Sequence, residues 1–113
     1  MDRNALVYAT GVGLVLQVLM VLTGHYLPAV KALFAAGGMG LSLVAGVLYA
    51  ERARASWKGD LTGGAIAGGV CALIGIAISV ILGDVPPGLL VLGTAFSVIT
   101  GLVGGGLGKM AFP

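Results

Sequence analysis

The chain has 113 residues, of which 58% are hydrophobic and only 9% are charged, and it contains 21 glycines. Soluble domains carry about 25% charged residues, so this composition excludes a water-soluble fold with an ordinary solvated surface. The formal net charge of +2 is too small to indicate a nucleic-acid partner. Most of the chain therefore has lipid as its solvent, and its length suits a single domain.

Charged residues divide the chain into four long uncharged stretches. Roughly 20 residues of helix cross the hydrocarbon core of a bilayer, and the predicted helices cover about residues 4–24, 28–51, 60–83 and 87–109. The strands of a membrane β-barrel would be about half as long and would alternate in polarity. The sequence therefore predicts an all-α membrane protein, a bundle of four transmembrane helices in one domain over residues 1–113.

The first predicted helix carries polar side chains at membrane depth. Thr10 and Gln17 share a face of this helix, and Ser42 is embedded in the next. Polar groups inside a membrane cost free energy and are candidates for function. Gln17 either donates a hydrogen bond to another helix or lines a path for a solute. The path hypothesis assigns Thr10, Gln17 and Ser42 to its lining.

The turns of the two halves resemble each other. A shift of 59 residues places Gly24 on Gly83 and Pro28 on Pro87. This pattern predicts two tandem hairpins of two helices each. Repeats that share one orientation are related by an axis along the membrane normal, so we expect a pseudo-twofold axis in that direction.

Two titratable residues follow the glycines that end the first and third predicted helices. His25 and Asp84 occupy equivalent positions of the proposed repeat, and Lys31 lies nearby in the sequence. They are either solvated turn residues or the outer mouth of a solute path. In the second case a His–carboxylate pair could act as a pH-sensitive gate.

Small residues recur every three or four positions along the last two predicted helices. Lipid provides no hydrophobic drive for helix association, so close backbone approach at small residues supplies the packing energy. These faces pack either within one chain or between copies of it. The predicted packing residues are Gly64, Gly68, Gly75, Ser79, Gly93, Ser97, Gly101, Gly105 and Gly108.

Basic residues are distributed unevenly between the connections. Five lie near the chain ends and in the middle connection, namely Arg3, Arg52, Arg54, Lys58 and Lys109, whereas the two opposite turns contain only Lys31. Lys and Arg are enriched in cytoplasmic loops. The sequence therefore predicts cytoplasmic N and C termini, in a bacterial-type inner membrane or a plasma membrane.

No reaction is indicated by the residues. With one histidine, one cysteine and no carboxylate expected inside a span, we predict no catalytic group, no metal site and no cofactor. The size resembles that of the small multidrug resistance transporters, whose mechanism depends on a glutamate embedded in the first helix. Residues 4–50 contain no acidic residue, so that mechanism is excluded.

Two functions remain open. The first is a small channel or uniporter-like protein that works as a homo-oligomer and conducts a small solute or ion. The second is an accessory or assembly subunit that docks on a larger membrane complex and transports nothing. The expected partners are the lipid bilayer and either further copies of the chain or another membrane protein.

Overall fold

The structure is a computed structural model that describes residues 2–31 and 34–112, with side chains described outside residues 30–35. The elements assigned within these residues are all helical: α1 (Arg3–Tyr26), α2 (Pro28–Lys31), α3 (Phe34–Ala53), α4 (Trp57–Ile81) and α5 (Leu89–Ala111). Among the described helices, α1, α4 and α5 are long and apolar enough to cross a membrane, whereas α3 falls short of the same criterion. These three helices fit an integral membrane protein.

The helix ends differ from the predicted ones because capping residues extend them. Asp2 caps α1 by accepting a hydrogen bond from the Ala5 amide at 3.0 Å. Ser56 caps α4 by accepting one from the Gly59 amide at 3.3 Å, so this helix begins at Trp57, ahead of the predicted residue 60. A side-chain oxygen at this position satisfies an amide that has no partner within the helix.

The second and fourth predicted helices also change. The predicted helix 28–51 corresponds to the single turn α2 followed by α3, with residues 32–33 outside the described part of the chain. The fourth helix begins at Leu89, after both prolines of the preceding turn. Gly83 starts that turn with a φ of 77°, which an L side chain rarely adopts.

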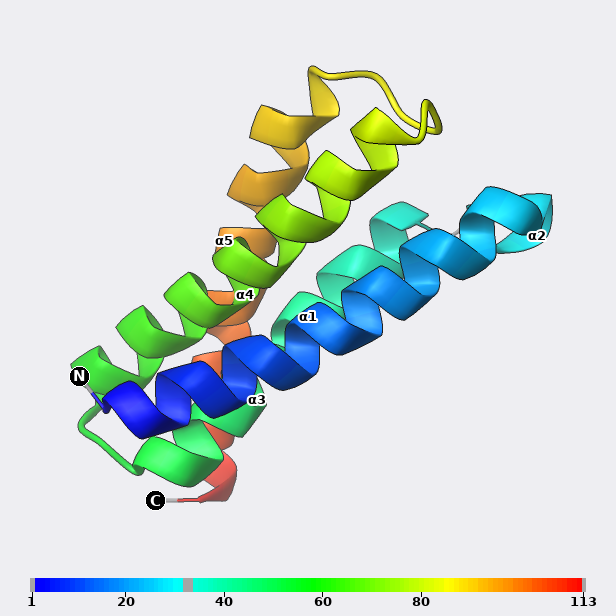
Figure 1. Ribbon diagram of the computed structural model, residues 1–113. Helices are drawn as coiled ribbons and strands as arrows, with labels where there is room; N and C mark the ends of the chain where they lie inside the picture. The colour runs from blue at the N-terminus through cyan, green and yellow to red at the C-terminus, as the bar shows by residue number, and fades with distance from the viewer. Residues whose placement is uncertain (1, 32–33, 113) are drawn as a thin grey trace.

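The long helices form two hairpins, α1 with α3 and α4 with α5. α5 packs against α3 and α4, and α1 packs against the same pair from the opposite side. The two hairpins diverge away from the termini, which lie together at one end with the α3–α4 connection (Figure 1). The molecule measures 40 × 21 × 20 Å, and its long dimension matches a bilayer with its headgroups, about 40–45 Å.

The predicted pseudo-twofold axis finds no support in this packing. Such an axis would relate α1 to α4 and α3 to α5, so the contact of α3 with α4 would have an equivalent between α5 and α1. α3 packs extensively on α4, and α1 has no comparable contact with α5 in the described residues. The similarity of the two turns therefore does not extend to the arrangement of the helices.

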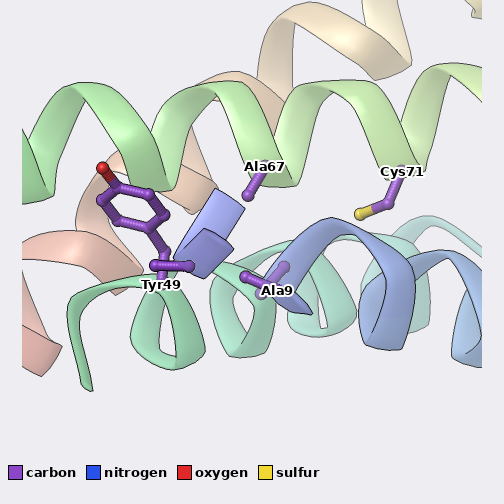
Figure 2. Packing of buried hydrophobic residues seen from close by; sticks show 6 residues of the cluster. Ala9, Tyr49, Ala67 and Cys71 are labelled. Atoms are coloured by element: carbon purple, nitrogen blue, oxygen red, sulfur yellow. The ribbon is translucent and has the colours of Figure 1, made fainter. Parts of the chain in front are cut away.

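The core near the termini is built from small side chains around one large one. Tyr49 is fully buried, and its hydroxyl oxygen accepts a hydrogen bond from the Asp2 amide at 3.2 Å. Figure 2 shows its ring beside Ala67 and Ala9, with Cys71 further along α4. Opposite the ring stands Gly63, where an added Cβ would overlap the ring atoms. The absence of a side chain at Gly63 thus provides the space for Tyr49.

Glycines bring the backbones of α3, α4 and α5 into direct contact. A Cβ added to Gly64 would lie 2.5 Å from the Gly101 carbonyl oxygen, and one added to Gly68 would lie 2.8 Å from the Gly101 Cα. Gly105 faces the Asp60 carbonyl in the same way. Backbone approach of this kind is possible only where no side chain intervenes.

The remaining predicted packing residues lie elsewhere. Gly108 faces Ala50 and Val47 of α3, and Gly75 faces Gln17 of α1. A Cβ added to Gly93 would meet side chains, those of Ile76 and Leu89. The two serines of the predicted set, Ser79 and Ser97, line a cavity instead.

Candidate functional site: an interhairpin cavity

A cavity of about 410 Å³ lies where the two hairpins diverge; we call it the interhairpin cavity. Every long helix contributes to it, together with the α4–α5 connection. Its lining is apolar apart from three side chains, Gln17, Ser79 and Ser97. The described residues that line it are Gln17, Met20, Val21, Gly38, Met39, Ala72, Gly75, Ile76, Ser79, Val85, Leu89, Leu92, Gly93, Phe96 and Ser97.

Gln17 forms the inner end of the cavity and joins three helices. Its Nε2 donates a hydrogen bond to the Gly38 carbonyl of α3 at 3.1 Å and lies 3.5 Å from Ser42 Oγ. Its Oε1 lies between α3 and α4, since a Cβ added to Gly38 would be 3.6 Å away and one added to Gly75 3.4 Å away. Both glycines line the cavity, so the amide is presented to it.

Ser42 and Cys71 complete a buried polar cluster behind Gln17. Ser42 Oγ donates to the Gly68 carbonyl at 3.1 Å, and Cys71 Sγ donates to the same oxygen at 3.3 Å. Both side chains are fully buried. This cluster holds α3 against α4 and gives Gln17 a fixed position.

Ser79 is the second polar group of the cavity wall. Only 2% of this residue is exposed, and its Oγ has no hydrogen-bond partner among the described residues. Its backbone carbonyl accepts a hydrogen bond from the Asp84 amide at 3.0 Å, which closes the C-terminal turn of α4 around Gly83. This hydrogen bond fixes the backbone of Ser79 at the end of the helix.

His25 and Asp84 meet at the outer end of the cavity. His25 Nδ1 lies 2.8 Å from Asp84 Oδ2, and the pair links the α1–α3 hairpin to the α4–α5 connection. Their neighbours Val21, one turn earlier in α1, and Val85 both line the cavity. The His25 side chain is 32% exposed and that of Asp84 only 9%. The side chain of Lys31, the third predicted mouth residue, lies outside the described part of the structure.

The predicted path residues are distributed differently. Gln17 lines the cavity, whereas Ser42 lies behind it with its hydroxyl engaged on α4. Thr10 stands two turns from Gln17 toward the termini and is half-buried, away from the cavity lining. The structure thus brings Gln17 and Ser42 together and keeps Thr10 apart.

Asp60 is a buried carboxylate at the residue where the third predicted helix begins. It lies in the first turn of α4 and is fully buried. Oδ1 accepts a hydrogen bond from the Ala55 amide at 3.1 Å, and Oδ2 has no hydrogen-bond partner among the described residues. The sequence indicates this burial by spacing. Asp60 precedes Gly64 by four residues and Gly68 by eight, so it shares the helix face that packs against α5.

The cavity suits an uncharged ligand. None of the described residues that line it is Asp, Glu, Lys, Arg or His, and an ion at membrane depth without a counter-charge costs several kcal/mol. Comparison with family models, characterised proteins and solved structures gives no match for the chain. The function is therefore argued from the geometry of this cavity.

Proposed function

We propose that this protein crosses the membrane with four helices and carries a small solute, which it binds in the interhairpin cavity. The observation that supports this is a large apolar cavity that ends at an oriented amide, Gln17. Apolar walls with a few placed polar groups are typical of small-molecule sites. If the helices served only to pack against one another, side chains would fill this space.

The geometry favours a carrier over an open channel. Between Gln17 and the termini, α3, α4 and α5 touch through Gly64, Gly68 and Gly101. A solute at Gln17 would therefore cross only if the hairpins moved relative to each other. His25 and Asp84 join the hairpins at the opposite end, at 2.8 Å, where their separation would open the cavity. Rocking of one helix pair against another is the usual motion of carriers.

The orientation follows from charge. Arg3, Arg52, Arg54, Lys58 and Lys109 belong to the end of the molecule that carries the termini and the α3–α4 connection. The positive-inside rule assigns this end to the cytoplasm. In this orientation the interhairpin cavity opens toward the outer side of the membrane. The helix α3 crosses the membrane together with α1, α4 and α5.

A matched pair of glycine variants tests the carrier proposal. Gly38→Leu fills the cavity, because a Cβ at Gly38 has ordinary contacts with Gln17 and Met20. Gly40→Leu adds the same side chain where nothing lies within 4 Å. Liposomes that contain the protein are shrunk osmotically with neutral solutes from urea to hexanediol, and their re-swelling is followed by light scattering.

We expect faster re-swelling than in empty liposomes for at least one solute, with loss of the acceleration in Gly38→Leu and its retention in Gly40→Leu. Ion conductance should stay at the level of empty membranes, because a carrier has no continuous pore. Equal rates for both variants, or steps of ionic current in planar bilayers, would contradict the proposal.

A further inference from the structure

Two of the three polar residues that line the interhairpin cavity, Gln17 and Ser79, have hydrogen-bonding capacity that no described residue uses. Ser79 Oγ has no partner among the described residues, although the residue is only 2% exposed. Gln17 Nε2 donates a hydrogen bond to the Gly38 carbonyl, and Gln17 Oε1 is directed between Gly38 and Gly75. A buried polar group without a partner is destabilising, so such groups on a cavity wall gain free energy when a ligand supplies a hydrogen bond.

The two groups are close to each other on the wall. Ser79 follows Gly75 by one turn of α4, and residues four apart in a helix lie on the same face. Gln17 packs directly on Gly75, with its Cβ 3.2 Å from where a Gly75 Cβ would be. A single small ligand group can therefore lie between the amide and the hydroxyl once the Ser79 side chain rotates about χ1 toward the cavity.

The chemistry of these groups selects the ligand group. An amide oxygen only accepts hydrogen bonds, whereas a serine hydroxyl both donates and accepts. A ligand hydroxyl matches both, because it donates to Gln17 Oε1 and accepts from or donates to Ser79. A carbonyl or an ether lacks the proton for the amide oxygen, and a charged group lacks a counter-charge in the lining.

The rest of the cavity sets the size and polarity of the ligand. Leu89, Leu92 and Phe96 form an apolar wall on α5, opposite Met20 and Val21 of α1. An apolar cavity of about 150 Å³ binds benzene, so the volume of about 410 Å³ holds roughly fifteen non-hydrogen atoms. The apolar body of the ligand then extends from the hydroxyl along these side chains.

We propose that the interhairpin cavity binds a neutral, mostly apolar molecule with one hydroxyl group, such as an alkylphenol or a medium-chain alcohol. The hydroxyl lies between Gln17 and Ser79. This inference rests on the proposed function, since it names the substrate class of the same cavity.

The test compares two probes that differ by one oxygen atom, 4-butylphenol and butylbenzene. Binding to the purified protein in detergent is followed by the rise in its unfolding temperature with probe concentration. For the wild-type protein we expect the phenol to bind about three- to tenfold more tightly than the hydrocarbon, the effect of one or two neutral hydrogen bonds. Ser79→Ala should bring this ratio close to one and leave the affinity for butylbenzene unchanged.

Thr94→Val is the matched control. Thr94 Oγ1 is likewise buried and without a partner among the described residues, but Thr94 lines a separate, smaller hollow between α4 and α5. This variant should keep the preference for the phenol. Both substitutions remove an unpartnered hydroxyl, so both variants should fold.

The outcomes separate this inference from the carrier proposal. Equal affinity of the wild-type protein for the two probes, or a preference that survives Ser79→Ala, overturns the hydroxyl inference. Failure of both probes to bind overturns it as well. The liposome assay with Gly38→Leu and Gly40→Leu decides the carrier proposal independently, because it uses solutes of a different class.

Discussion

Asp60 and Lys109 hold the connection between α3 and α4 from two sides. Asp60 Oδ1 accepts from the Ala55 amide at 3.1 Å, and Lys109 Nζ donates to the Ala55 carbonyl at 2.6 Å. The connection also contains Arg54, whose φ of 46° is unusual for a residue with a side chain. The two side chains thus satisfy the backbone of a tight connection at the end of the bundle, where helix ends leave amides and carbonyls unpaired.

Substitutions at Asp60 should separate its hydrogen bond from its charge. Asp60→Ala leaves the Ala55 amide without its acceptor and should lower the free energy of unfolding by about 1–3 kcal/mol. Asp60→Asn keeps an acceptor oxygen and removes a buried charge, so its stability should stay within about 1 kcal/mol of the wild type. Reversible unfolding in mixed micelles measures both.

Glu51→Ala is the control for Asp60, because Glu51 is an exposed acidic residue on the neighbouring helix. Its effect should stay within about 0.5 kcal/mol. If Asp60→Asn proved as destabilising as Asp60→Ala, the carboxylate charge itself would be required, and a cationic partner would have to be sought.

At the level of helices, the packing of α4 on α5 depends on surfaces without side chains. Gly101 meets the Gly64 carbonyl on α4 and the Gly46 position on α3, so α5 sits in contact with both. Each glycine weakens an isolated helix by about 1 kcal/mol relative to alanine. The close contact of backbones offsets this cost where glycines of two helices meet, as at Gly64 and Gly101.

Gly101→Ala should therefore separate the helices. The added Cβ would overlap the Gly64 carbonyl oxygen, which is backbone and cannot rotate away. Overpacking of this kind costs about 1–3 kcal/mol, occasionally more. Gly11→Ala is the matched control, because nothing lies within 4 Å of its added Cβ, and it should leave stability unchanged or raise it by up to about 1 kcal/mol. Unfolding in mixed micelles measures the stability of both variants. An equal loss of unfolding free energy in both would contradict the packing argument.

At the level of the whole molecule, the homo-oligomer stays a prediction. It is based on the small-residue faces of the helices, and all seven glycines of the predicted packing set lie against other residues of the same chain. Large apolar side chains remain exposed on every long helix, as expected for a surface that faces lipid. The cavity is formed by one chain, so the carrier proposal does not require an oligomer.

Native mass spectrometry of the protein released from mild detergent should give a defined homo-oligomer if the surface of one chain pairs with another. The matched measurement is affinity purification from native membranes. A monomer in the first experiment, with a second protein recovered in the second, would contradict the homo-oligomer and favour the accessory-subunit interpretation.

The sequence by itself determined the class of the protein and the local features of its chain. Long uncharged stretches predicted helices that cross a membrane, because backbone groups in lipid must be satisfied within the helix, and α1, α4 and α5 are long and apolar enough to do so. The spacing of Gly64 and Gly68 placed them on one face, which follows from helical geometry alone. The exact helix ends were missed where a capping side chain such as Ser56 extends the helix.

Only the tertiary structure decided which faces meet and what space they leave. The interhairpin cavity depends on Gln17 meeting Gly75, residues that are far apart in the chain. Likewise, the burial of Asp60 depends on α5 lying against it. Residue spacing defines a face of a helix, but the partner of that face is chosen by the packing of the whole bundle. Ser79 likewise lines the space between the hairpins, and its hydroxyl has no partner among the described residues.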